Sequence, residues 1–130
     1  MSEPLRVLIV EDSEDDAALL LLELRRGGYK TQFQRVDNAT DLDAALVGHS
    51  WDLVITDHNL PGFDSTAALA IVKQAGLDVP VIIVSGSIGE DVAVAAMKEG
   101  AHDYIMKDNL ARLVPAVGRE LREAETRIQE

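Results

Sequence analysis

Short runs of apolar residues alternate along the chain with longer segments of helical character. Residues 6–10 are rich in leucine and β-branched residues and are apolar on both faces, as in a strand at the centre of a sheet. Residues 31–36 alternate instead, in a way typical of an edge strand, and runs at residues 53–56, 79–84 and, more weakly, 103–106 complete a set of five strands. Five strands separated by helices indicate βα units on a parallel sheet.

Charged residues and glycines bound the helical segments. Residues 15–26 carry acidic side chains in their first turn and two arginines in their last, and they stop at Gly27. A fifth helix is expected within residues 113–127, where Pro115 is tolerated only in the first turn. Three Ala-rich segments that end near a glycine are predicted as the intervening helices: residues 40–47, 65–74 and 90–99.

Five βα units predict a single-domain, doubly wound α/β sandwich of the flavodoxin-like kind, with parallel strand order 2-1-3-4-5. Its core is expected within about residues 5–120. The last helix carries apolar residues spaced by three and four positions: Val114, Val117, Leu121, Ala124 and Ile128. The early members are predicted to face the core, and the alternative is a helix whose residues 121–130 extend beyond the domain toward a partner or a following domain.

Composition narrows the classes of function. The chain has 130 residues, of which 47% are hydrophobic and 27% charged, as in one soluble globular domain. A net charge of −11 argues against direct binding to nucleic acid or to an anionic membrane. The absence of cysteine excludes disulfides and thiolate metal sites. Apolar runs are far shorter than the roughly 20 residues of a membrane span, and no signal-peptide pattern is visible, so a cytoplasmic location is expected.

Polar residues follow four of the five predicted strands. Glu11 and Asp12 follow the first strand, Asp57 the third, Ser85 the fourth and Lys107 the fifth. We expect them to converge, because ligands of such sheets bind at the carboxyl ends of the strands. Carboxylates in one crevice repel by about 4 kcal/mol per pair at about 4 Å, so a cation must balance them. Oxygen ligands favour Mg²⁺, with Mn²⁺ as a substitute.

A carboxylate beside Mg²⁺ is a suitable nucleophile toward phosphorus, and its product is an aspartyl phosphate. The transferred phosphoryl group spreads charge over three oxygens, which the metal ion, the Lys107 ammonium and the Ser85 hydroxyl can stabilise. Little general-base chemistry is needed because ionised Asp57 is already the nucleophile. The three histidines of the chain lack metal-ligand spacing.

These five strand-end residues, in their order and spacing, resemble those of the response-regulator receiver domain of two-component signalling. The resemblance begins at about Leu5 and makes residues 1–130 a receiver domain. Residues 57–64 resemble the phosphoacceptor loop of the family, and residues 101–107 resemble its fifth strand. The fold that this resemblance implies is the one that the strand and helix pattern predicts.

The resemblance also implies a role for each site residue. Asp57 is the phosphoacceptor, and phosphorylation makes Ser85 shift toward the phosphoryl group while Tyr104 turns inward. The implied metal ligands are Asp12 and Asp57 directly, Glu11 through a water molecule and Asn59 through its backbone carbonyl.

Partners follow from the same resemblance. A histidine kinase or phosphotransfer protein is expected to donate the phosphoryl group, and a downstream protein or an attached sensor or kinase module to receive the signal. No separate substrate is expected, because the only reactions are phosphorylation and dephosphorylation of Asp57 itself. A homodimer is compatible with this scheme. The cognate kinase and the output are not encoded in any motif of the chain.

The chain departs from the family pattern at Asp108. Many receivers have a proline after the lysine, often with a cis peptide bond, which without proline costs about 2.5 to 4 kcal/mol. The geometry of the loop after Lys107 is therefore open. Two other functions also stay open: a receiver-like interaction module without phosphotransfer, and a phosphatase of the haloacid-dehalogenase kind. Chain order disfavours the phosphatase, whose nucleophile follows the first strand and has an Asp two residues later, where this chain has Asn59.

Overall fold

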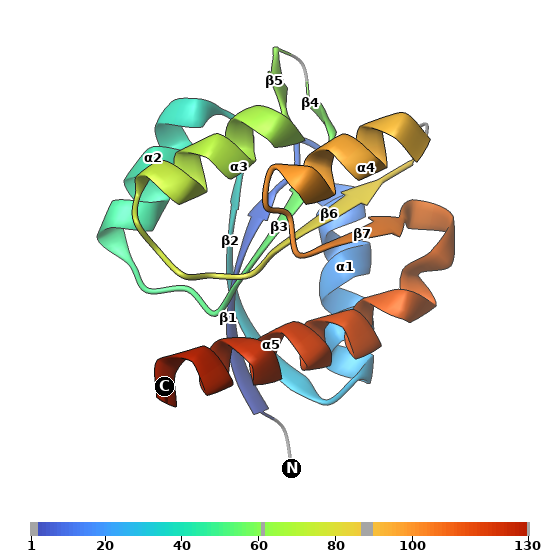
Figure 1. Ribbon diagram of the computed structural model, residues 1–130. Coiled ribbons are helices and arrows are strands. Elements are labelled where there is room, and N and C mark those ends of the chain that lie inside the picture. The colour runs from blue at the N-terminus through green and yellow to red at the C-terminus, as the bar shows by residue number, and fades with distance from the viewer. Residues whose placement is uncertain (1–2, 61, 87–89, 130) are drawn as a thin grey trace.

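A parallel sheet forms the centre of the computed structural model, which describes residues 3–60, 62–86 and 90–129 (Figure 1). Its strands are β1 (Glu3–Val10), β2 (Tyr29–Val36), β3 (Leu53–Asp57), β6 (Val81–Ser85) and β7 (Asp103–Met106). They lie in the order β2-β1-β3-β6-β7, and every neighbouring pair is parallel. Counted among the parallel strands alone, this is the predicted order 2-1-3-4-5, which is confirmed.

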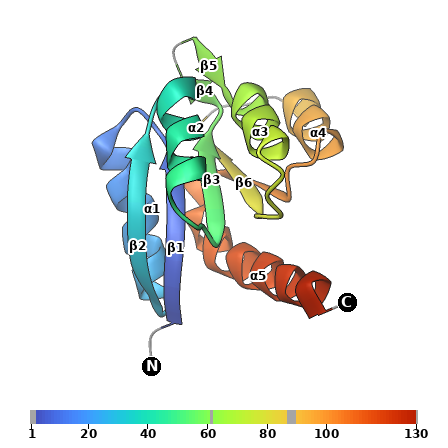
Figure 2. The same ribbon diagram turned by 90° about the vertical axis from the view of Figure 1, so that its left-hand side faces the viewer.

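Helices cover both faces of the sheet, as predicted for a doubly wound fold. They are α1 (Glu14–Arg26), α2 (Ala39–Gly48), α3 (Ser65–Gln74), α4 (Glu90–Lys98) and α5 (Leu113–Gln129). Helices α1 and α5 lie on one face and α2, α3 and α4 on the other (Figures 1 and 2). None of the helices in the described ranges combines the length and the apolar character that crossing a membrane requires.

Strand β1 shows why the sheet is buried on both sides. Val7 and Ile9 contribute to the core under α1 and α5, whereas Leu8 and Val10 contribute to the core under α2, α3 and α4. All four are fully buried. The edge strand β2 is much less buried: Val36 is its one buried residue, and Phe33 is half exposed. The doubly apolar run therefore predicted a central strand correctly, and the prediction of residues 31–36 as an edge strand is confirmed.

Two short elements were not predicted. Strands β4 (Asn59–Leu60) and β5 (Phe63–Asp64) form a separate antiparallel hairpin after β3, with Gly62 at a φ of 67° in its turn. A 3-10 helix, η1 (Lys107–Arg112), connects β7 to α5. Neither element is long enough to produce a hydrophobic period, so the apolar pattern could not reveal them.

Helix α5 uses the early part of its apolar repeat as a core face. Val117 is fully buried, and Leu121 packs against the same core. Val114 sits against Gly27 at the end of α1. The prediction that these early members face the core is confirmed. The side chain of Ile128 lies outside the described part of the structure, so the extension of this helix toward a partner stays a prediction.

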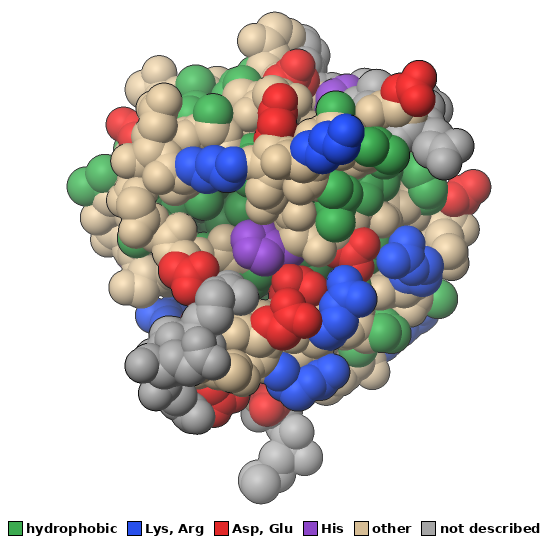
Figure 3. Space-filling model, in the orientation of Figure 1, with side chains coloured by type: hydrophobic (Ala, Val, Ile, Leu, Met, Phe, Trp, Pro, Cys, Tyr) green, Lys and Arg blue, Asp and Glu red, His purple; other side chains and the backbone are tan. Residues whose placement is uncertain are grey.

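Ion pairs tie α5 and η1 to β7. Asp103 lies 3.4 Å from Arg112 and 3.0 Å from Arg119, and Arg119 also lies 3.1 Å from Glu120. On the face shown in Figure 3, basic and acidic side chains are mixed and do not form a single basic patch. The pairs of Asp103 with Arg112 and Arg119 link β7 to η1 and α5.

Candidate functional site

The predicted site residues meet at the carboxyl-terminal rim of the sheet. Glu11 and Asp12 follow β1, and Asp57 is the last residue of the neighbouring strand β3. Ser85 ends β6, and Lys107 follows β7 at the start of η1. The parallel register brings these ends level, since Val10 pairs with Thr56 and Asp57 with Val84. The predicted convergence of strand ends is therefore present.

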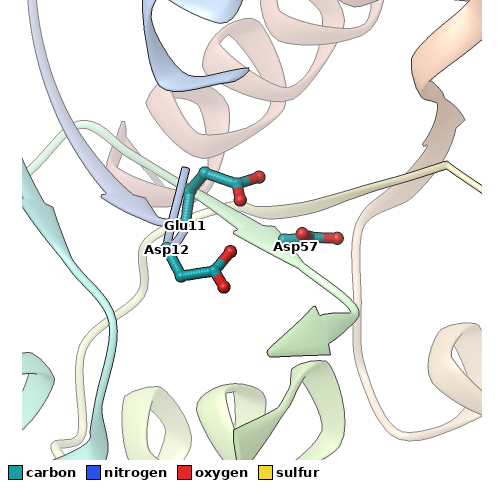
Figure 4. Close-up of side chains that lie close together, drawn as sticks. All are labelled: Glu11, Asp12 and Asp57. Atoms are coloured by element: carbon teal, nitrogen blue, oxygen red, sulfur yellow. The ribbon is translucent and has the colours of Figure 1, made fainter. Parts of the chain in front are cut away.

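Three carboxylates form a compact cluster at this rim. Glu11, Asp12 and Asp57 each offer an oxygen within 4.8 Å of the others (Figure 4). Glu11 and Asp57 are 1% and 6% exposed, whereas Asp12 is exposed. Oxygen-only ligands around one point suit a hard divalent cation such as Mg²⁺, and the exposed Asp12 leaves one side of the cluster open to water.

Lys107 balances part of this negative charge. Its Nζ lies 3.1 Å from Glu11 Oε2, 3.3 Å from Asp57 Oδ2 and 2.6 Å from Asp16 Oδ2. Burial alone lowers the pKa of Lys107, but the hydrogen bonds that its ammonium donates to Asp16 and Glu11, together with the charge of Asp57, outweigh this effect, so the pKa is raised. Lys107 therefore stays a cation and can stabilise negative charge on Asp57 or on a group attached to it.

Asp16 is a site residue that was not predicted. It is the third residue of α1, where an acidic side chain is expected to favour the helix dipole whether or not it belongs to a site. The available signal was its position: Asp16 lies in the first turn of the helix that begins two residues after Asp12, so it remains at the rim. Its contact with Lys107 depends on the course of a long side chain, which the sequence pattern does not specify.

Glu11 is buried with both carboxylate oxygens engaged. Oε1 accepts a hydrogen bond from the Ser13 backbone N–H at 3.1 Å, and Oε2 faces Lys107. Burial raises the pKa of Glu11 to about 7, against the opposing effects of the Ser13 N–H and of Lys107. A bound cation would favour the ionised form and displace the proton.

Ser85 and Tyr104 lie beside the acidic cluster. Ser85 is fully buried, and the Tyr104 hydroxyl is buried with no hydrogen-bond partner of good geometry among the described residues. Burial raises the pKa of Tyr104, a contact with Ser85 lowers it, and the charge of Asp57 raises it. The hydroxyl of Tyr104 is therefore directed inward, toward Ser85 and Asp57.

The acceptor loop continues into the hairpin and α3. His58 Nδ1 lies 2.7 Å from Ser65 Oγ, which links the residue after Asp57 to the first residue of α3. Asn59 is the first residue of β4, and its backbone carbonyl stays a predicted metal ligand. No cis peptide bond occurs among the described residues, and the Lys107–Asp108 bond is therefore trans.

Comparison with known proteins identifies the family. A family model described as the response regulator receiver domain matches residues 7–118. The transcriptional regulatory protein PrrA of Mycobacterium tuberculosis is 35% identical over 118 residues, which cover 90% of this chain and 50% of that protein. The response regulator protein FleR of Pseudomonas aeruginosa is 35% identical over 107 residues, 82% of this chain and 22% of that protein. The chain thus spans half or less of these relatives.

Solved structures agree with the sequence comparison. A response regulator receiver domain from Clostridium thermocellum superposes with a TM-score of 0.81 at 26% identity, covering 94% of this chain and 98% of that one. The signal receiver domain of a histidine kinase from Syntrophus aciditrophicus has a TM-score of 0.74 at 30% identity, covering 92% and 91%. The chain belongs to the response regulator receiver domain family of two-component signalling.

Proposed function

We propose that this receiver accepts a phosphoryl group on Asp57, from a histidine kinase or a phosphotransfer protein, in a Mg²⁺-dependent reaction. The observation that carries the proposal is the surroundings of Asp57. Its carboxylate lies within 4.8 Å of those of Glu11 and Asp12 and 3.3 Å from the ammonium of Lys107. A nucleophilic carboxylate with metal ligands on one side and a fixed cation on the other suits phosphoryl transfer.

The acidic cluster would hold the metal ion. Asp12 and Asp57 would bind it directly, Glu11 through a water molecule and Asn59 through its backbone carbonyl, and Mn²⁺ could use the same ligands. When bound, the ion neutralises the carboxylates and the charge that develops on the phosphoryl oxygens.

In the transfer step, an oxygen of ionised Asp57 forms a bond to phosphorus as the phosphorus–nitrogen bond of a donor phosphohistidine breaks. The imidazole leaves and takes a proton from solvent. Lys107 and the Ser85 hydroxyl stabilise charge on the phosphoryl oxygens. Attack of water on the aspartyl phosphate later restores the carboxylate and releases phosphate, so no separate substrate takes part.

Ser85 and Tyr104 would carry the conformational response. The buried hydroxyl of Tyr104 lies next to Ser85, without a hydrogen bond of good geometry to any residue that the structure describes. A shift of Ser85 toward the phosphoryl group would change the surroundings of this hydroxyl and bias Tyr104 between two positions. We propose that the switch regulates a downstream protein or an attached module.

Phosphorylation is tested by incubating the protein with a small acyl phosphate and Mg²⁺ and measuring the intact mass. The wild type should gain one phosphoryl group, and Asp57→Asn should gain none because the amide is not nucleophilic. Asp43→Asn, an exposed acid on α2, is the matched control and should react as the wild type does. Phosphorylation of Asp57→Asn, or undiminished reaction with a chelator present, would overturn the proposal.

A further inference from the structure

Lys107 has a carboxylate partner outside the acidic cluster. Its Nζ lies 2.6 Å from Asp16 Oδ2, closer than the 3.1 Å to Glu11 Oε2 and the 3.3 Å to Asp57 Oδ2. Asp16 does not belong to the group of three carboxylates that could share a metal ion. An ammonium group has three N–H donors, and three carboxylates are enough to occupy all of them.

The start of α1 holds Asp16 at the rim. Ser13 caps this helix, and its Oγ accepts a hydrogen bond from the Asp16 backbone N–H at 3.2 Å. The paired side chains are partly open to water, with Lys107 26% and Asp16 38% exposed. The ammonium can therefore exchange one partner for another by rotation of its own side chain, without movement of the buried core.

Binding of a divalent cation at the acidic cluster would affect the three partners of Lys107 differently. A divalent cation would neutralise Glu11 and Asp57 and weaken their attraction for the ammonium. Asp16 lies outside the cluster and would keep its full charge. Among the described carboxylates that pair with Lys107, Asp16 is thus the one that continues to compete with a phosphoryl oxygen for the ammonium.

We propose that Asp16 is a positioning residue, which holds the Lys107 ammonium in the resting protein and has to release it when Asp57 carries a phosphoryl group. The inference rests on the proposed function and deepens it, because it assigns to the first turn of α1 an influence on how tightly the site holds a phosphoryl group. An interaction present in one state and absent in the other shifts the balance between them.

Beryllofluoride, which imitates a phosphoryl group on a carboxylate, provides the test. It is titrated into the full chain at saturating Mg²⁺, with binding followed by amide NMR shifts. Asp16→Asn should bind it about twofold to fivefold more tightly than the wild type, as expected for loss of a partly exposed ion pair from the resting state alone.

Two variants separate this ion pair from a general effect of charge. Asp15→Asn removes the same charge from the adjacent exposed residue of the same helix turn and should bind with wild-type affinity. Asp16→Glu keeps the charge, still reaches the ammonium and should also retain wild-type affinity. Amide spectra recorded before the titration verify that each variant is folded.

The outcomes distinguish this inference from the proposed function. Unchanged or weaker binding by Asp16→Asn, or equal gains in Asp16→Asn and Asp15→Asn, would overturn the role of Asp16 and leave the proposed function intact. Failure of the wild type to bind beryllofluoride with Mg²⁺ would overturn the proposed function and this inference with it.

Discussion

Glu11 is an ionisable residue that is almost completely buried. Its side chain is 1% exposed and is held by the Ser13 backbone N–H and by Lys107. Burial raises the pKa of this carboxyl to about 7, although both neighbours lower it. In the metal-free protein Glu11 is therefore close to its midpoint at neutral pH, and cation binding is coupled to release of its proton.

The raised pKa of Glu11 predicts how the stability of the metal-free protein depends on pH. Between about pH 4.5 and 7 the folded protein still binds the Glu11 proton that the unfolded chain has lost. The contribution of Glu11 to the free energy of unfolding is therefore fully present below about pH 4.5, the ordinary pKa of a glutamate. It is lost as the pH rises through about 7, the pKa of Glu11 in the folded protein.

Glu11→Gln has no titratable group at this position, so its free energy of unfolding should not fall with the titration of residue 11. The free energy of unfolding of Glu11→Gln, minus that of the wild type, should rise by about 1 to 3 kcal/mol over this range. Urea unfolding with a chelator present, at several pH values, measures the difference. A difference that stays constant with pH would contradict the assigned effect of burial.

At the residue scale, the strand-end positions could be predicted and one side-chain contact could not. Glu11, Asp12 and Asp57 follow from the rule that parallel strands end at one rim, together with the chemistry of carboxylates. The pairing of Asp16 with Lys107 joins residues 91 positions apart through a flexible side chain. The geometry of this contact depends on how α1 and the end of β7 meet in the folded protein, which the pattern of residues near Asp16 or Lys107 does not specify.

At the scale of elements, α1 and α5 approach each other closely at Gly27. A Cβ atom on Gly27 would lie 2.6 and 2.7 Å from the two γ-carbons of Val114. The φ of Gly27 is −80°, which any residue adopts, so lack of space and not backbone conformation is the reason for a glycine there. Val114 is β-branched and has little freedom to move aside.

Gly27→Ala should therefore lower the free energy of unfolding by about 1 to 3 kcal/mol through overpacking. Gly48→Ala is the matched control, since a Cβ atom there would meet nothing within 4 Å and Gly48 ends α2 without a positive φ. The control should be neutral or stabilising by up to about 1 kcal/mol. Urea denaturation of both variants makes the comparison, and equal stabilities would contradict this account of the contact.

The main elements could be predicted because each has a period or a boundary signal. The Ala-rich segment at Ser65–Gln74 was predicted to the residue, and β1 was found from its continuous apolar run. The β4–β5 hairpin and η1 were missed, because two-residue strands and a 3-10 turn produce neither signal. Both elements flank the site, where η1 positions Lys107 and the hairpin follows Asp57.

At the scale of the whole molecule, the site depends on the crossovers of the sheet. Residues 11, 57 and 107 lie far apart in the sequence, and the strand order β2-β1-β3-β6-β7 brings their strands to one rim. Helices cover both faces of the sheet (Figure 2). Under the proposed function, a phosphodonor would approach at the rim, where Asp12 is exposed.

The central claim is that Asp57, among several acids at this rim, is the residue that accepts the phosphoryl group. Borohydride reduces an acyl phosphate to an alcohol, which converts phosphorylated aspartate to homoserine and marks its position. After reaction with a small acyl phosphate and Mg²⁺, then reduction and proteolysis, peptide mass mapping should find homoserine at position 57 alone. Homoserine at position 12 or 16 would contradict the account, as would its absence from a protein that has gained phosphate.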